Sequence, residues 1–560
     1  MEIQDSRRLT GPNLVQDAPG AVLEVTFSDA DAAVVDGWRD EMHLIFRRLD
    51  LCDPELRVKR QQRGAWLVAT AGVDQLYAVT EVMETAWSRA VSIARGISIP
   101  ESPDISGLMT ALEEEANPRL IALARLAEAE RVTFLWDDEE VSLGTGRGSQ
   151  TWPSRALPDP DTMDWSRFDD VPTAVITGTN GKSTNVRLIS EMAACADIPY
   201  GSTSTDWIRV NDDILDTGDY SGPGGARKVL RDRRVGIAIL ETARGGLLRR
   251  GAGVNRADVA LVTNVADDHM GQYGIQTVEE LAEAKLIVHR TVVAGGLLIL
   301  NADDEILVRA SGALPVMDVG WFSLDPSHPL LVKNRKDGGI ACTVEDGTIC
   351  YYERGARYPV VPVVDVPVTL GGVARYNVAN CLSATATAFR LGIPASAIRQ
   401  GLKSFTSDAD SNPGRGNYFE AGSIRILLDY AHNVHGLEAI LSTTAMLGAS
   451  RRIMTLSTAG DRTEEEIRSL ARAAASSDVE KILVSDCVGY ERELGPGGVP
   501  DLLMDELRLC QQGACVLGTE LDAVRHAFDI ARSGDLLILL VKAQRKECLD
   551  VIRKEMMHRR

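Results

Sequence analysis

Short apolar runs alternate with amphipathic stretches through most of this chain, and the alternation predicts an α/β protein. Residues 235–240, 259–263 and 296–300 are short, apolar and rich in β-branched side chains, as is typical of buried parallel strands. Helical spacing of apolar residues separates them, which predicts a sheet with helices on both faces. In such a sheet, ligands bind at the carboxyl ends of the strands.

A second α/β pattern begins near residue 409. Its expected strands and helices are strands at 424–428, 452–457, 481–485 and 535–541, and helices at 463–476 and 521–533. Two of these strands end in polar clusters, Asp429-Tyr430-Ala431-His432-Asn433 and Gly460-Asp461-Arg462. This unit therefore carries candidate site residues of its own.

The first 160 residues have a different pattern, which predicts a small α+β domain. The expected elements are strands at 21–27 and 66–71, helices at 31–49, 73–95 and 105–130, and two short strands within 132–143. The acidic run 113–115 predicts a solvated helix face, and the Gly- and Pro-rich residues 144–160 predict a linker. We therefore expect three domains, at residues 1–160, 161–408 and 409–560.

Composition narrows the possible functions. The 560 residues carry a net charge of −20, which argues against nucleic acid as the main partner. The start of the chain lacks a signal-peptide core, and no apolar run reaches spanning length, so we expect a cytoplasmic protein that does not enter a membrane. The nine cysteines form no spaced pairs, which fits reduced thiols.

A glycine loop between an apolar run and a helical pattern is the strongest chemical signal. The run 174–177 leads into Gly178-Thr179-Asn180-Gly181-Lys182-Ser183-Thr184. At a strand–loop–helix junction, backbone N–H groups and the helix end converge on a phosphate. Lys182 can reach the β- and γ-phosphates, and Ser183 can bind Mg²⁺. The loop is shortened, because Ile176 replaces the usual first glycine; a plain glycine turn is the alternative.

Four further residues are candidates from their positions. Glu241 follows a predicted strand and suits Mg²⁺, although a surface carboxylate is the alternative. His269 lies in an Asp-Asp-His loop and could bind a metal or position a phosphate. Lys285 lies in a predicted helix, and its own pattern predicts a solvated lysine. Arg415 lies where the second and third domains join, and its guanidinium suits a phosphate.

These motifs together resemble the Mur ligase family. The matching segments are 178–184, Glu241, 263–269, 284–285, 301–304, 376–380 and 429–432, in the family's order. Segments 218–223, 241–249, 412–415 and 460–462 are similar to the Mur-ligase-like half of cyanophycin synthetases, and residues 8–14 resemble the start of their N-terminal domain. Those enzymes carry an ATP-grasp module before the Mur-like half. Here only a short stretch separates Leu143 from the glycine loop.

The resemblance implies a central P-loop ATPase domain, a C-terminal Rossmann-like α/β domain and an ATP-dependent amide ligase. In that reaction ATP phosphorylates a carboxylate, and an amine attacks the acyl phosphate. It implies ATP and Mg²⁺ as cofactors and amino acids or peptides as substrates, an aspartyl carboxylate among the candidates. We also expect a homo-oligomer. A silent partner of a cyanophycin-type synthetase, a simple ATP hydrolase and a folate polyglutamylating ligase are the alternatives.

The resemblance also implies a role for each matching residue. Gly178, Thr179, Asn180, Gly181, Lys182, Ser183 and Thr184 would hold the phosphates, with Asn380 at the adenine, Arg415 at the γ-phosphate and Asp429 at the ribose. Mg²⁺ would be bound by Ser183 or Thr184, Glu241 and His269, and by Lys285 if it is carbamylated. Catalysis would rest on Lys182, Glu241, His269, Lys285 and Arg415. Substrates would be bound by Arg244, Arg249, His432, Asp461 and Arg462, although Arg244 and Arg249 could instead be surface arginines.

Overall fold

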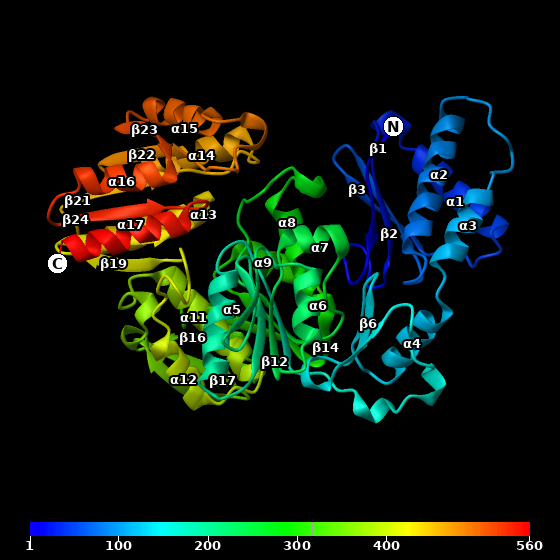
Figure 1. Ribbon diagram of the computed structural model, residues 1–560, viewed down its shortest axis with the longest axis horizontal. Coiled ribbons are helices and arrows are strands. Elements are labelled where there is room, and N and C mark those ends of the chain that lie inside the picture. The colour runs from blue at the N-terminus through cyan, green and yellow to red at the C-terminus, as the bar shows by residue number, and fades with distance from the viewer. Residues whose placement is uncertain (316, 560) are drawn as a thin grey trace. The chain divides into compact units, whose positions relative to one another are not determined.

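The structure is a computed structural model that describes residues 1–315 and 317–559. It contains two compact units, each assembled from several segments of the chain (Figure 1). The first unit comprises Met1–Thr177, Ile198–Val262 and Ala282–Leu298. The second comprises Gly178–Asp197, Thr263–Leu281 and Ile299–Arg560. The units are described one after the other.

A four-stranded antiparallel sheet with helices on one face opens the first unit (Figure 1). Its order is β1-β2-β4-β3, with β1 Glu2–Leu9, β2 Gly20–Thr26, β3 Leu56–Gln61 and β4 Gly64–Thr70. Helices α1 Val34–Arg48 and α2 Leu76–Ala94 bury their apolar stripes against it. The predicted α+β N-terminal fold is confirmed, and its sheet also contains β1 and β3, which the sequence did not predict.

The predicted helix at 105–130 is wrong, because two helices occupy this stretch. They are α3 Ser106–Glu115 and α4 Pro118–Ala129. Proline disfavours the helical conformation in the preceding residue, and Asn117 instead caps α4 by accepting a hydrogen bond from Leu120 N at 3.2 Å. The Glu115 carboxylate accepts from Tyr77 N and Ala78 N, so this end of the acidic run caps α2 rather than facing solvent alone.

The predicted linker at 144–160 is also wrong in its first part, which is folded. Strand β7 Gln150–Pro153 pairs with β6 Glu140–Leu143, which pairs with β5 Phe134–Trp136. The backbone N–H of Arg147 donates to Val235 O at 2.9 Å. The glycines of this segment therefore make a tight docking turn and not a flexible connection.

The first unit also holds a mixed sheet whose parallel centre was predicted. The strand order is β11-β10-β9-β12-β8-β13-β14. The strands are β8 Thr173–Thr177, β9 Tyr200–Thr203, β10 Trp207–Val210, β11 Asp213–Thr217, β12 Ile237–Glu241, β13 Ala257–Val262 and β14 Val292–Asn301. Strands β9, β12, β8 and β13 are parallel, whereas β10 and β11 form an antiparallel extension that the sequence did not predict. Helices α6 Pro223–Arg231 and α7 Arg244–Arg250 lie between strands in sequence.

The second unit begins with helix α5 Lys182–Ala194, which follows the glycine loop. It packs on α11 Arg375–Arg390 and α12 Ala395–Ser404. The other elements before residue 409 are α8 Val278–Leu286, α9 Glu305–Ser311, α10 Pro329–Lys336, and strands β15 Val319–Ser323, β16 Ala341–Glu345, β17 Thr348–Glu353 and β18 Ala356–Pro362. Both α5 and α11 bury polar as well as apolar side chains.

A six-stranded sheet completes the second unit, in the order β19-β20-β24-β21-β22-β23. Its strands are β19 Asn417–Ala421, β20 Ile424–Asp429, β21 Arg451–Leu456, β22 Lys481–Asp486, β23 Ala514–Thr519 and β24 Asp535–Leu540. One face packs on α13 Val434–Met446, α14 Glu464–Ala475 and α15 Gly498–Leu509, and the other on α16 Glu520–Ile530 and α17 Arg545–His558 (Figure 1). All pairs except β19–β20 are parallel, so the predicted C-terminal α/β fold is confirmed.

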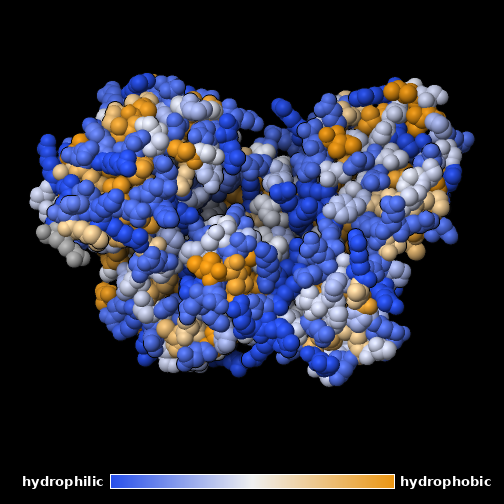
Figure 2. Space-filling model, viewed as in Figure 1, coloured by the Kyte–Doolittle hydropathy of each residue, from blue (hydrophilic) through white to orange (hydrophobic). Residues whose placement is uncertain are grey.

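The surface agrees with the acidic composition. On the face shown in Figure 2, hydrophilic residues predominate and hydrophobic ones form small, scattered groups. Within the described part of the chain, no helix has the length and apolar character that crossing a bilayer requires.

Candidate active site

The glycine loop turns sharply into α5, as the sequence predicts. Gly181 has φ +88°, and a Cβ atom there would clash with the Asn380 side chain, so only glycine fits between the loop and α11. Lys182 Nζ donates to Gly178 O at 3.0 Å and to Thr179 O at 2.9 Å. The ammonium group therefore lies over the loop whose N–H groups are the candidate phosphate ligands.

A second segment fixes the shape of this loop. Thr179 N donates to Asn264 O at 2.8 Å, and Asn180 N donates to Asn264 Oδ1 at 2.9 Å. In return, Thr263 Oγ1 donates to Asn180 O at 2.6 Å. The Thr-Asn pair that the resemblance singled out thus acts as a scaffold for the loop.

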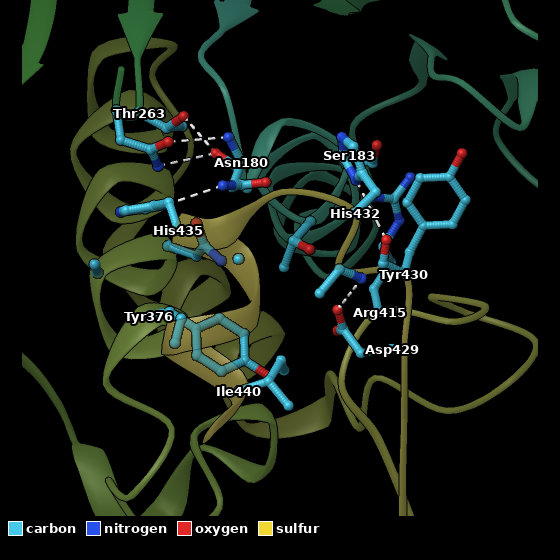
Figure 3. A pocket seen from close by; sticks show the side chains of 18 of the residues that line it. Asn180, Ser183, Thr263, Tyr376, Arg415, Asp429, Tyr430, His432, His435 and Ile440 are labelled. Atoms are coloured by element: carbon cyan, nitrogen blue, oxygen red, sulfur yellow. Dashed lines mark hydrogen bonds between the residues drawn. The ribbon is translucent and has the colours of Figure 1, made fainter. Parts of the chain in front are cut away.

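The C-terminal helix α13 also contacts the loop directly. Asn180 Nδ2 lies 2.9 Å from His435 Nδ1 (Figure 3). The same Nδ2 lies 3.1 Å from Asn433 Oδ1. Burial lowers the pKa of His435, which keeps the ring neutral and allows Nδ1 to accept the hydrogen bond. Asn433 is the N-cap of α13 and accepts from Gly436 N at 2.8 Å. Sequence reasoning placed Asn433 only in a strand-end polar cluster and missed His435, although an Asn before a helical pattern is a recognised start signal.

A cavity of about 200 Å³ lies beside the loop (Figure 3). Its lining includes the loop residues Asn180, Gly181, Ser183 and Thr184, the α11 residue Asn380, and Arg415, Asp429, Tyr430 and His432 from the C-terminal part. The structure therefore brings part of the predicted phosphate loop, together with Arg415 and the predicted adenine and ribose residues, around one cavity; Gly178, Thr179 and Lys182 are not part of its lining. Tyr376, Tyr430 and His435, which also line it, were not predicted.

Arg415 and Asp429 form the C-terminal wall of this cavity. The Arg415 guanidinium carbon lies 4.4 Å from the centre of the Tyr430 ring, a cation–π contact. Asp429 ends β20, and its Oδ1 accepts from Ala431 N at 2.7 Å. Burial raises the pKa of Asp429 to about 6, although Arg415 and the Ala431 N–H act in the opposite direction.

This raised pKa predicts a pH dependence of ATP binding. If Asp429 accepts hydrogen bonds from the ribose, only its ionised form can do so, and the KM for ATP should fall as the pH rises through about 6. The same shift has the opposite effect on stability, because the folded state binds the proton more tightly. Its contribution declines as the pH rises from the ordinary value of 3.8 to about 6. Asp429→Asn should flatten both profiles; an unchanged KM profile in this variant would contradict the assignment.

A buried cluster of charged and titratable side chains surrounds Asp268. Arg462 donates to Asp268 Oδ1 at 2.5 Å, and its other Nη lies 3.0 Å from His269 Nε2. The side chains of Arg462 and Asp268 are 5% and 13% exposed. Burial would raise the pKa of Asp268, but His432, Arg462 and His269 hold it well below its usual range. The hydrogen bond and charge of His432 lower the pKa of Asp268 most, and Arg462 acts in the same direction, while burial lowers the pKa of His432 itself.

The second cavity, of about 280 Å³, is lined by charged and polar residues and also by apolar ones, such as Met270 and Leu470. The charged and polar residues include Asp267, Thr458, Arg462, Thr463 and Glu466. His432 lines this cavity and the first one. Of the predicted amine-substrate residues, His432 and Arg462 therefore face a cavity, whereas Asp461 is exposed and lines neither.

The remaining candidates lie in the first unit. Glu241 is the last residue of β12 and is 2% exposed, and Arg244, at the start of α7, is 8% exposed. Arg249 is exposed. Lys285 is only 3% exposed, so the solvated lysine that its own pattern predicted is wrong: the turn of α8 that carries it faces the interior. A buried lysine needs a special environment, which keeps Lys285 a functional candidate.

The donor groups suit Mg²⁺ in part. Ser183 offers a hydroxyl and Glu241 a buried carboxylate, both hard oxygen ligands. Among the described residues, no group of three or more His, Cys, Asp or Glu side chains could hold a metal ion. His269 Nε2 is already engaged by Arg462, so this atom would become a ligand only after the arginine moved.

Comparisons with known sequences place this geometry in a family. Residues 176–388 match the Mur ligase middle domain, and residues 414–542 match the Mur ligase glutamate ligase domain. Cyanophycin synthetase from Crocosphaera subtropica is 34% identical over 371 residues, which is 66% of this chain and 42% of the relative. The chain thus spans less than half the length of that enzyme. A UDP-N-acetylmuramoyl-L-alanyl-D-glutamate–2,6-diaminopimelate ligase from Geobacter metallireducens is 26% identical over 70% of this chain and 80% of the relative.

Solved structures share the fold. FolC of E. coli in complex with DHPP and ADP superposes with a TM-score of 0.51 at 18% identity, covering 70% of this chain and 89% of FolC. A bifunctional folylpolyglutamate synthase/dihydrofolate synthase with Mn, AMPPNP and L-glutamate bound gives a TM-score of 0.50 at 18% identity, over 68% of this chain and 89% of that enzyme. The two family domains together span more than half of the sequence, and the chain belongs to the Mur ligase family.

Proposed function

We propose that this protein is an ATP-dependent carboxylate–amine ligase that releases ADP and phosphate. The observation that carries the proposal is the cavity lined jointly by Ser183 of the glycine loop, Asn380 of α11, and Arg415 and Asp429 of the C-terminal part. A nucleotide hydrolase has no obvious use for a phosphate loop completed by a second α/β sheet. The names of the relatives, cyanophycin synthetase and diaminopimelate ligase, support the same reaction class.

The proposed chemistry begins with a carboxylate, which is a poor electrophile. Its oxygen attacks the γ-phosphorus of ATP and ADP leaves; an amine then attacks the acyl phosphate, and phosphate leaves with the transferred oxygen. Catalysis of this kind is mainly positioning and charge neutralisation. Lys182, Arg415 and the loop N–H groups other than those of Thr179 and Asn180, which donate to Asn264, would hold the phosphates, while Asn380 and Asp429 would hold the nucleoside. Mg²⁺, which the resemblance assigns to Ser183 and Glu241, would neutralise phosphate charge.

The second cavity supports a cationic amine substrate. Asp267 and Glu466 bring negative charge to its wall, and Arg462 offers a guanidinium that can bind a carboxylate. An amino acid with a basic side chain would satisfy both charges. His432 lines both cavities, so a substrate held here would lie next to the candidate nucleotide site.

Removing the negative charge of Asp267 from the wall of the second cavity should weaken the binding of the amine but not that of ATP. We expect Asp267→Asn to raise the KM for the amine about tenfold, the loss of one charged hydrogen bond, and to leave the KM for ATP unchanged. Glu464→Gln is the matched control, because Glu464 begins α14, the helix that carries Glu466, but it does not line the cavity and pairs with Arg468 on the surface. Equal effects of the two variants would contradict a specific role for Asp267.

A phosphate-release screen tests the proposed function. ATP and Mg²⁺ are combined with pairs of amino acids and dipeptides, aspartyl carboxylates and basic amines included, and products are identified by mass spectrometry. Phosphate release that depends strictly on two substrates, with an amide product, supports the ligase. Release without either substrate supports a hydrolase, and ATP binding without turnover under every combination supports a silent partner.

A further inference from the structure

Helix α7 begins with the candidate site residue Arg244 and closely follows the candidate Glu241 in sequence, but it is too short to be stable alone. It contains seven residues, Arg244–Arg250, and starts three positions after Glu241. Isolated helices of this length do not persist in water. At its start, Ala243 N donates to Ser221 O at 2.8 Å. Something else must hold the last turn, whose carbonyl groups have no partners within the helix.

The N-terminal segment of the chain supplies those partners. Thr10 donates to Arg250 O twice, from its backbone N–H at 2.7 Å and from Oγ1 at 3.2 Å. Arg7 Nε donates to Leu248 O at 3.3 Å. Past the end of the helix, Ala252 N donates to Pro12 O at 2.6 Å. A segment more than 200 residues away in sequence therefore caps α7 at its C-terminal end.

The two backbones approach so closely that glycine is required on both sides. A Cβ atom at Gly11 would lie 2.5 Å from Ala252 O. Gly251 has φ +84°, and a Cβ atom there would lie 2.6 Å from Gly11 O. Because interlocked backbones leave no room for a side chain, the position of residues 10–12 sets the position of residues 250–252.

The capping segment is itself anchored on the N-terminal sheet. Arg7 lies in β1, its side chain is 7% exposed, and its Nη1 pairs with Asp5 at 2.6 Å and with Glu24 of β2 at 3.2 Å. Its guanidinium carbon lies 4.9 Å from the centre of the Trp66 ring on β4. The sheet thus fixes Arg7, and Arg7 in turn fixes the last turn of α7.

We propose that the N-terminal sheet is part of the ligase machinery: residues 7–12 clamp α7 and so hold Arg244 in place after Glu241, where Arg244 binds the acidic substrate. The inference rests on the proposed ligase function. Arg7, Thr10 and Gly11 are positioning residues, since they act through α7 and do not touch the substrate. A change far from the reacting groups that misplaces them by about 1 Å can lower the rate up to about 10²-fold, so loss of the clamp should affect the site.

The test compares three variants of the full chain. Gly11→Ala forces the segment away from Ala252, Thr10→Val removes one donor while keeping the side-chain size, and Gly107→Ala is the control, because nothing lies within 4 Å of a Cβ atom there. We expect Gly11→Ala to raise the KM for the carboxylate substrate about tenfold, with the KM for ATP unchanged. Thr10→Val should raise it less, and Gly107→Ala should match the wild type.

Hydrogen–deuterium exchange supplies a readout that needs no substrate. In Gly11→Ala, the amides of residues 247–252 should exchange faster, while those of α5 should not change. Unchanged exchange in 247–252, or faster exchange with both KM values unaltered, would overturn the proposal. A parallel rise of both KM values would do so too, because it would indicate a general loss of structure. If the wild type shows no two-substrate turnover, the ligase function fails, whereas the exchange result still decides whether the clamp exists.

Discussion

Lys182→Ala should abolish ATP-dependent phosphate release. Lys182 Nζ now contacts Gly178 O and Thr179 O at the turn, so it needs only to move toward a bound nucleotide to reach the β- and γ-phosphates. Its ammonium group would neutralise charge as the γ-phosphoryl group is transferred. Loss of one such preorganised group costs about 10²–10³-fold in turnover. Steady-state phosphate release at saturating substrates measures the effect.

The matched control for this change is Lys336→Ala. Lys336 is an exposed lysine on α10, so its loss removes the same charge from the same unit without touching the loop. Thermal unfolding of both variants should be close to that of the wild type, since Lys182 is not a core residue. Full phosphate release by Lys182→Ala would show that the glycine loop is a structural turn and not a phosphate site.

Lys285→Ala should lose most activity and regain part of it with small carboxylates. The Lys285 side chain is 3% exposed, so its amine lies in the interior of the protein and not in solvent. Reaction of the neutral amine with carbon dioxide would give a carbamate and release a proton, which replaces a cation by an anion suited to Mg²⁺. The resemblance to Mur ligases implies this modification. Acetate or formate, added to Lys285→Ala, should then replace the missing carboxylate.

Two comparisons separate the carbamate from a simple structural lysine. Lys285→Arg keeps a long cationic side chain, but its guanidinium does not form the carbamate, so this variant should be as inactive as Lys285→Ala. Because the arginine side chain fills the space, added carboxylates should not restore its activity. Activity of Lys285→Ala should rise with acetate concentration and saturate. Unimpaired activity of Lys285→Ala, or a loss that no carboxylate reverses, would contradict the carbamate.

The sequence predicted the α/β frame and the turn of the glycine loop well because both depend on local signals. The apolar run before Gly178 and the helical pattern after it fixed the strand, turn and helix that the structure contains. Strand-end residues such as Glu241 and Asp429 followed from the rule that parallel strands present their carboxyl ends together. These inferences needed no information about distant contacts.

The predictions that were wrong or missing depend on tertiary contacts between residues that are far apart in the sequence. Lys285 lies within a normal helical pattern, and only the packing of α8 shows that its side chain is buried. The glycines at 144–148 looked like a linker, but Arg147 N bonds to Val235, almost ninety residues further on. The contacts of Asn180 with Asn433 and His435 join positions that no sequence spacing relates. Pairings of this kind decide the site and are not visible in a single sequence.

Transfer of an oxygen atom from the carboxylate to phosphate tests the central claim most directly. The carboxylate substrate that the screen identifies is labelled with ¹⁸O, incubated with ATP, Mg²⁺ and the amine, and the released phosphate is examined by mass spectrometry. If the site activates a carboxylate as an acyl phosphate, each released phosphate carries one ¹⁸O from the substrate, and the amide retains the other. Unlabelled phosphate would contradict the account, because it would show that water and not the carboxylate attacks ATP.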